Sequence, residues 1–108
     1  MIESPKTQEA IISGTKDLIA RKIIYAGRVQ GVGFRAVTAR IAAQLQLAGY
    51  VKNLQTGQVE IFVQGEKVGI DSLITLLAQK MKNNILRVDI EASLPRDDLR
   101  GFDVRYDD

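Results

Sequence analysis

Two stretches with the alternation typical of strands lie next to each other in the middle of the chain, at residues 50–54 and 58–64. In the second stretch, every other residue is a β-branched apolar one: Val59, Ile61 and Val63. Only residues 54–57 connect the two stretches, whereas parallel strands need a crossover of about a dozen residues or more. The pair is therefore predicted to form an antiparallel hairpin, which excludes a parallel, doubly wound sheet at this point.

Five further elements surround the hairpin. Residues 21–29 combine β-branched and aromatic residues before a glycine break and predict a first strand, while residues 86–92 and 102–106 alternate as half-buried strands. Helices are predicted after Gly33, with Gly49 as the expected stop, and after Gly65. Their apolar stripes are Phe34, Val37, Ile41 and Leu45, then Ile70, Leu73, Ile74, Leu77 and Met81.

The order of these elements is β-α-β-β-α-β with a short extra strand at the C-terminal side. It predicts an α+β fold of the ferredoxin-like, split βαβ kind, in which an antiparallel sheet carries two helices on one face. Residues 21–108 are expected to form this single domain. We interpret residues 1–20 as a mobile N-terminal extension, with a short docked helix at residues 7–20 as the alternative.

The amino-acid composition of the chain excludes several classes of function. The 108 residues contain no Cys and no His, which excludes disulfides, thiolate and imidazole metal ligands, cysteine nucleophiles and schemes that depend on histidine. A net charge of +2 is too small to indicate nucleic acid. No signal-peptide pattern and no membrane-length apolar run occurs, so a cytoplasmic protein without membrane attachment is expected.

The stretch from residue 27 to residue 35 reads GRVQGVGFR and joins the first strand to the first helix. Its glycines permit a tight turn and a close backbone approach to a ligand, and the helix start offers unpaired N–H groups. Arg35 lies in the first turn, the unfavourable end of the helix dipole for a cation. A bound anion would explain that position. A ligand-free turn with a solvated Arg35 is the alternative.

Two nucleotide motifs are excluded for this stretch. Residues 31–36 fit the dinucleotide pattern G-x-G-x-x-G/A, but the next strand leaves by a hairpin, and Asn53 stands where an acidic residue is needed. A Walker A loop requires Gly-Lys-Ser/Thr, and Gly33 is followed by Phe34 and Arg35. Asn53 itself is a common turn residue near a hairpin.

Several segments together resemble the acylphosphatase family: GRVQGVGFR at 27–35, GYVKN at 49–53, GQVE at 57–60, QG at 64–65 and GFDVRY at 101–106. The resemblance covers about residues 21–106. It implies metal-independent hydrolysis of the carboxyl–phosphate bond of acyl phosphates, without a cofactor. We expect the chain to act as a monomer. Thr56 and residues 83–86 depart from the usual pattern of the family, outside the matched catalytic pair.

The same resemblance implies roles for particular residues. Arg35 and the backbone amides of the loop would bind the phosphate, and Asn53 would orient the attacking water. The loop residues are Gln30, Gly31, Val32, Gly33 and Phe34. Direct attack by water needs no phospho-enzyme, in keeping with a chain that lacks Cys and His. Partners would be a small acyl phosphate and inorganic phosphate, as product or competitive ligand.

Other functions stay open at this point. An acylphosphatase-like module of a carbamoyl-transfer enzyme, such as a hydrogenase maturation factor, would need further domains with cysteine-rich zinc elements. RNA-recognition domains share the βαββαβ order, but the strand at residues 58–64 carries Phe62 as its sole aromatic residue. An inactive descendant that only binds phosphate is the third alternative.

Overall fold

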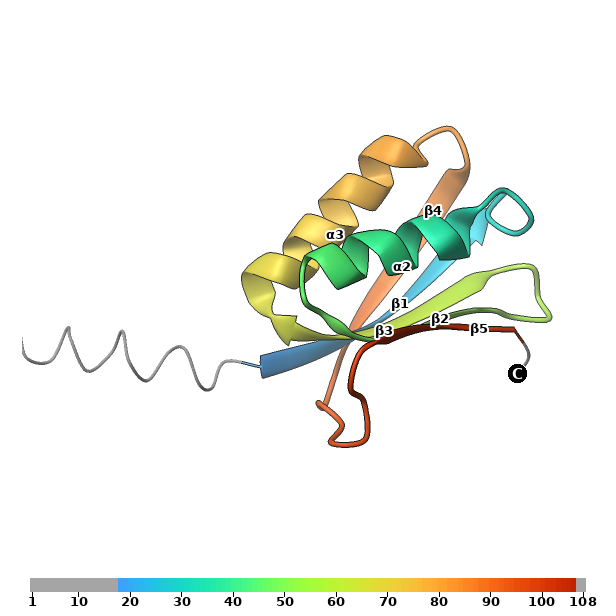
Figure 1. The fold of residues 1–108 in the computed structure, drawn as a ribbon. Coiled ribbons are helices and arrows are strands. Elements are labelled where there is room, and N and C mark those ends of the chain that lie inside the picture. The colour runs from blue at the N-terminus through green and yellow to red at the C-terminus, as the bar shows by residue number, and fades with distance from the viewer. Residues whose placement is uncertain (1–17, 107–108) are drawn as a thin grey trace, which may run out of the picture.

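The computed structural model describes residues 18–106, which form a five-stranded sheet with two helices on one face (Figure 1). The elements are β1 (Leu18–Gly27), α2 (Phe34–Gln44), β2 (Ala48–Asn53), β3 (Val59–Glu66), α3 (Lys67–Lys80), β4 (Ile85–Ser93) and β5 (Phe102–Arg105). The predicted ferredoxin-like arrangement with a short extra strand is confirmed. Neither helix is long and apolar enough to cross a membrane.

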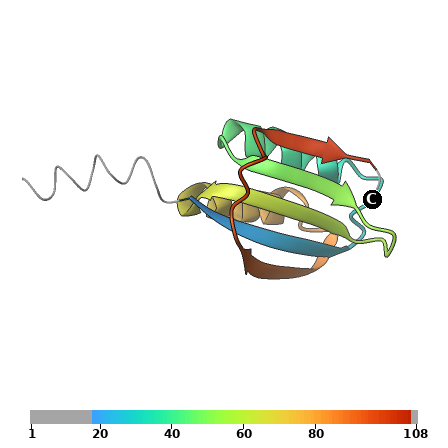
Figure 2. The ribbon, with the colours of Figure 1, turned by 90° about the horizontal axis from the view of Figure 1, so that it is seen from below.

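The strand order is β4-β1-β3-β2-β5, and Figure 2 shows the sheet from its helix-free side. The predicted hairpin is confirmed: β2 and β3 pair antiparallel, with Asn53 opposite Val59. In contrast to the antiparallel sheet that we predicted, β5 runs parallel to β2. The segment before β5 crosses the helix-free face and enters the sheet beside β2 (Figure 2). This crossing makes the parallel pairing possible.

The main core lies between the helices and the sheet. Buried side chains of β1 and β3, such as Ile23 and Ile61, meet the apolar stripes of the helices, including Ile41, Leu73 and Leu77. Each helix therefore buries one stripe, as its periodicity predicts. This packing holds the start of α2 at the end of the sheet where β1 finishes (Figure 1).

A second, smaller cluster covers part of the opposite face. Tyr50 and Phe62 stack with ring centroids 6.0 Å apart, and Leu99, from the loop between β4 and β5, is buried against them. The hydroxyl group of Tyr50 donates a hydrogen bond of 2.7 Å to a carboxylate oxygen of Glu60. The loop is thus fixed to the sheet, which places β5 beside β2.

Two predicted boundaries are wrong. β1 begins at Leu18, so residues 18–20 belong to the strand and not to an extension or a helix; residues 1–17 lie outside the described residues. Gly49 does not end the helix. It is part of β2, and α2 ends at Gln44, followed by Gln46 with a φ of 59°. A Cβ atom on Gly49 would lie 1.9 Å from the carbonyl oxygen of Phe62, so a close strand approach requires this glycine.

The prediction that residues 86–92 form a half-buried strand is also wrong in its burial. All residues of β4 except Ile85 and Ser93 are exposed. Leu86, Val88 and Ile90 keep 86%, 38% and 49% of their surface exposed. Alternation shows which side chains share a face but not whether anything covers that face, and β4 lies at the edge of the sheet.

Candidate active site

The loop between β1 and α2 forms a turn that depends on glycine. Gly31 and Gly33 have φ values of 77° and 84°, in the left-handed region, and Gly33 is the N-cap of α2. A Cβ atom at either position would meet no atom within 4 Å, so backbone conformation and not space requires glycine here. The glycines therefore set the direction in which the chain enters α2.

The first turn of α2 leaves backbone donors free for an anion. The first helical hydrogen bond runs from the N–H of Val37 to the carbonyl oxygen of Gly33, so the N–H groups of Phe34, Arg35 and Ala36 precede it. Gly33 offers no side-chain cap, and the first turn contains no acidic residue. Together with the helix dipole, this arrangement favours a bound anion.

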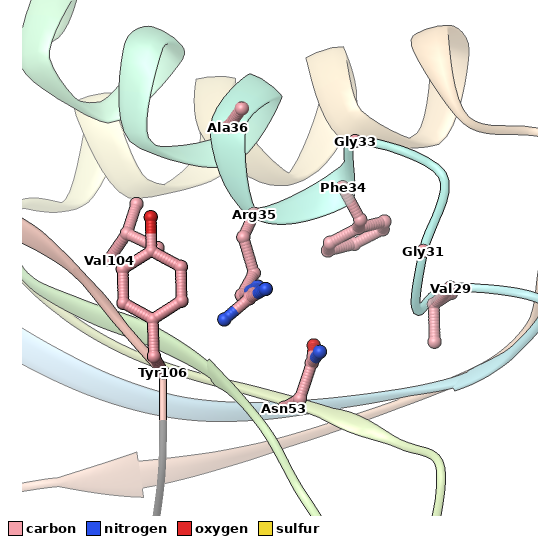
Figure 3. A pocket seen from close by; sticks show the side chains of 9 residues that line it. All are labelled: Val29, Gly31, Gly33, Phe34, Arg35, Ala36, Asn53, Val104 and Tyr106. Carbon is pink, nitrogen blue, oxygen red and sulfur yellow. The ribbon is translucent and has the colours of Figure 1, made fainter.

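A hollow of about 180 Å³ opens beside this helix start (Figure 3). Its lining comes from the loop, the first turn of α2, the end of β2 and the end of β5: Val29, Gly31, Gly33, Phe34, Arg35, Ala36, Asn53, Val104 and Tyr106. Three segments that are distant in sequence thus meet at one place: residues 29–36, Asn53 and residues 104–106. Phe34 is buried and packs on Tyr25 with ring centroids 5.0 Å apart, which anchors the helix start.

Arg35 is held in position by β5. Its Nη1 atom donates a hydrogen bond of 2.9 Å to the carbonyl oxygen of Arg105, and its guanidinium carbon lies 4.6 Å from the centre of the Tyr106 ring. Figure 3 shows the guanidinium group pointing from α2 into the hollow, toward Asn53. Arg35 is half-buried, and a guanidinium group can form a bidentate contact with an oxyanion.

Asn53 approaches the same hollow from the end of β2 (Figure 3). Its Oδ1 atom is buried and has no hydrogen-bond partner among the described residues. A buried polar atom without a partner costs free energy, and native structures usually supply one from a ligand or an ordered water. This amide therefore marks a position at which a water molecule or a ligand is expected.

The predicted site residues separate into two groups. Gly31, Gly33, Phe34, Arg35 and Asn53 line the hollow. Gln30 and Val32 do not. The side-chain amide of Gln30 donates to the carbonyl oxygens of Leu54 and Gln58, at 2.8 and 2.9 Å, and so ties the loop to the hairpin.

The base of the loop is fixed in a similar way. The N–H of Arg28 donates to the carbonyl oxygen of Asn84, and the side-chain amide of Asn84 donates back to the carbonyl oxygen of Arg28 at 3.0 Å. Gln30 and Asn84 thus hold the loop from both sides. Within residues 18–106, no group of three or more Asp, Glu, Cys or His side chains is placed to hold a metal ion.

Sequence reasoning missed Val104 and Tyr106 at the hollow, and the backbone of Arg105. Their signal was the segment 101–106, which contributed to the family resemblance without any role being assigned to it. The parallel pairing of β5 with β2, in which Val51 faces Val104, brings this segment beside Asn53. No local pattern in the sequence shows which strand β5 joins.

Comparison with known proteins identifies the family of this chain. The family model described as "Acylphosphatase" matches residues 21–104. The chain belongs to the acylphosphatase family. Hydrolysis of acyl phosphates is the function of this enzyme family, and the matched range contains the loop, Arg35 and Asn53.

Individual acylphosphatases agree with this assignment. The acylphosphatase of Legionella pneumophila (strain Corby) is 39% identical over 90 residues, which cover 83% of this chain and 98% of that protein. The crystal structure of acylphosphatase from Bacillus subtilis superposes with a TM-score of 0.73 at 30% identity, covering 82% and 99% of the two chains. The fold is also similar to a part of T. kodakarensis HypF, with a TM-score of 0.71 and 36% identity, but there the match covers only 12% of that chain.

Proposed function

We propose that this chain hydrolyses acyl phosphates by direct attack of a water molecule that Asn53 orients, while Arg35 and the loop hold the phosphoryl group. The observation that carries the proposal is the meeting of two groups in one hollow. One is a guanidinium aimed inward from α2, and the other is the buried amide oxygen of Asn53 on β2, to which no residue among 18–106 hydrogen-bonds (Figure 3). Membership of the acylphosphatase family supports the substrate class.

The phosphoryl group binds at the start of α2. Its oxygens accept hydrogen bonds from the free N–H groups of the first turn and from the guanidinium of Arg35. These donors are fixed before the substrate arrives, because Gly33 sets the entry to the helix and Arg105 holds the arginine. Fixed donors stabilise the charge that spreads over the phosphoryl oxygens in the transition state.

The water donates a hydrogen bond to the amide oxygen of Asn53, which leaves a lone pair of the water oxygen directed at phosphorus. The water oxygen forms a bond to phosphorus as the bond from phosphorus to the acyl oxygen breaks. The carboxylate leaves with the bonding electrons, and the proton of the water passes to the phosphate product. A carboxylate is a good leaving group, so this step needs no general acid and no covalent intermediate on the protein.

Hydrolysis of benzoyl phosphate in water enriched in oxygen-18 tests the proposal. We expect hydrolysis above the spontaneous rate, unchanged by a chelator, with the label in inorganic phosphate, because water attacks phosphorus. Inorganic phosphate should inhibit competitively. Label in benzoate would indicate attack on the carbonyl carbon and contradict the mechanism. A rate equal to that of a variant lacking both Arg35 and Asn53 would contradict the activity itself.

A further inference from the structure

β4 presents an open edge along its whole length. Among the described residues it pairs with β1 alone, and Figure 2 shows it at one margin of the sheet. Both of its faces are exposed, with Val88 and Ile90 on one face and Arg87, Asp89 and Glu91 on the other, while Leu86 lies at the irregularity near Gly27. An exposed edge strand with apolar side chains is a template for pairing with another strand.

The direction of the backbone groups on this edge follows from hydrogen bonds elsewhere in the sheet. Hydrogen bonding alternates along antiparallel strands, so one bond sets the pattern for its neighbours. The N–H of Leu54 donates to the carbonyl oxygen of Gln58 at 2.8 Å, so Gln58 faces β2. The next residue, Val59, then turns its backbone groups toward β1, where it pairs with Tyr25.

The same alternation continues across β1. Because Tyr25 faces β3, its neighbour Ile24 faces β4, where it pairs with Asp89. Asp89 therefore uses its backbone groups within the sheet. The backbone groups of the residues on either side of it, Val88 and Ile90, are directed to the free edge.

A second copy of β4 can pair with this edge about a two-fold axis in only a few registers. Residues whose backbone groups point to the free edge must lie opposite each other in the two copies. Centring on Asp89 places Arg87 opposite Glu91 twice but sets the two Asp89 carboxylates against each other at the axis. Centring on Ile90 sets Asp89 against Glu91 twice, and centring on Arg87 sets two guanidinium groups together. Like charges directly opposite are destabilising. Centring on Val88 places Arg87 opposite Asp89 twice, with the two valines in contact.

Arg87 and Asp89, the charged side chains that this register pairs across the axis, lie on the same face of β4. Arg87 and Asp89 form an ion pair within the strand at 3.0 Å, and both side chains are more than half exposed. On the other face the register brings Ile90 of one copy opposite Leu86 of the other. Leu86 lies at the irregularity opposite Ala26 and Gly27, and its side chain extends into solvent.

The surface next to this edge is also apolar. A pocket between α3 and β4 is lined by Tyr25, Ile74, Ala78, Lys82, Ile85 and Val88. A second strand at the edge would place its own apolar side chains against this pocket. No residue of β4 lines the hollow that holds Arg35 and Asn53, so such a partner leaves the candidate active site open.

We propose that the chain forms a two-fold dimer in which β4 pairs antiparallel with β4 of a second copy, in the register centred on Val88. The two sheets then form one continuous sheet, with the helices of both copies on the same face. Opposite charges across the axis and burial of Val88 and Ile90 stabilise the pairing. This dimer differs from the monomer that we expected from the sequence.

Sedimentation equilibrium of the full chain at low ionic strength gives the first test. The mass should rise with concentration from 11.9 kDa to twice that value. Arg87→Asp and Asp89→Arg each place like charges opposite one another and should raise the dissociation constant about tenfold. Circular dichroism checks that each variant is folded.

The double variant Arg87→Asp/Asp89→Arg separates this register from the one centred on Asp89. In the Val88 register the exchange restores two opposite-charge pairs, and dimerisation should return. In the Asp89 register it would place an aspartate opposite Glu91 and leave the dimer weak. A chain that stays at 11.9 kDa at every concentration, or a double variant that does not recover, overturns the proposal.

Disulfide trapping tests the register without relying on charge, since the chain has no native cysteine. In the proposed dimer the two Val88 positions form a hydrogen-bonded pair with a Cα separation of about 5.5 Å, within the range of a disulfide. Val88→Cys should therefore oxidise to a covalent dimer faster than Val68→Cys, a control at a valine of α3 that is more exposed than Val88. Equal rates, or faster oxidation of Ile90→Cys, would contradict the register.

Discussion

The guanidinium of Arg35 donates a hydrogen bond of 2.9 Å to the backbone carbonyl oxygen of Arg105, a residue 70 positions later in the chain. The bond joins the start of α2 to the end of β5 and directs the guanidinium into the hollow that Asn53 also faces (Figure 3). Because a backbone carbonyl provides the contact, the residue type at position 105 is not what holds the arginine.

Replacement of Arg35 should impair both substrate binding and turnover. Arg35→Ala removes the charged phosphate contact, and we expect a loss of about 3 kcal/mol of transition-state stabilisation, roughly a hundredfold in kcat/KM. Arg35→Lys should recover only part of it, since an ammonium group cannot make a bidentate contact and reach Arg105 as well. Steady-state kinetics with benzoyl phosphate measure the effect. Arg40→Ala, at an exposed position of the same helix, is the control and should be neutral.

Asn53→Ala should lower the activity of the protein without lowering its stability. We expect kcat to fall because the activation free energy rises by about 3 kcal/mol. The inhibition constant of inorganic phosphate should change less. The melting temperature should change little, because no residue among 18–106 hydrogen-bonds to the Oδ1 atom, so the substitution breaks no such bond within the described part of the chain. Full turnover in this variant would disprove its role in orienting water.

Substitution of Tyr106 should change kcat/KM only slightly, and the change should depend on loss of the aromatic ring. The ring is 76% exposed and stacks on the Arg35 guanidinium, a contact of about 0.5–1 kcal/mol at exposed sites. Tyr106→Ala should therefore lower kcat/KM only a few-fold, and Tyr106→Phe should keep the activity of the original chain. If the phenylalanine variant were as impaired as the alanine variant, the hydroxyl group and not the ring would be responsible.

Two glycine substitutions should differ sharply in their effect on stability. Gly49→Ala would force a Cβ atom against the carbonyl oxygen of Phe62 inside the β2–β3 pair, and we expect severe destabilisation or failure to fold. Gly31→Ala meets no atom within 4 Å, so it should cost only the strain of a positive φ, about 1–2 kcal/mol. Urea denaturation of both variants measures the difference. Equal losses would contradict the geometry.

Stability should fall in strongly alkaline solution. Burial, the hydrogen bond to Glu60 and its charge raise the pKa of Tyr50 to about 12, above its usual value of 10.0. As pH rises from 10 toward 12, the unfolded chain loses the phenolic proton while the folded chain keeps it, so the free energy of unfolding decreases. Tyr50→Phe should remove part of this slope in chemical denaturation series. The Tyr25 pKa is also raised by burial, so some slope should remain.

The fold and the two facing side chains could be read from the sequence because the relevant signals are local or paired with a known motif. A short connection sets the β2–β3 hairpin, glycines with positive φ set the turn before α2, and residues 49–53 and 27–35 match a family pattern. Arg35 and Asn53 do face one hollow, as that pattern implied.

Features that depend on distant parts of the chain could not be predicted in this way. Periodicity does not show that β5 joins β2 in parallel, so the contact between Arg35 and Arg105 was not foreseen. Gly49 was interpreted as a helix stop because a glycine after an apolar stripe is typical of one, whereas its cause is the nearby Phe62 carbonyl. Exposure of β4 likewise follows from its place at the edge, which alternation alone does not encode.

The parallel pairing of β5 with β2 also affects how the protein acquires its activity during folding. The loop, α2 and the hairpin are close in sequence and can form early, but the arginine receives its carbonyl partner only when a segment 70 residues away docks at the sheet edge. An intermediate with the glycine turn and both helices in place would still have a freely rotating guanidinium. We therefore expect turnover to recover during refolding only once β5 has docked, no earlier than helical content returns.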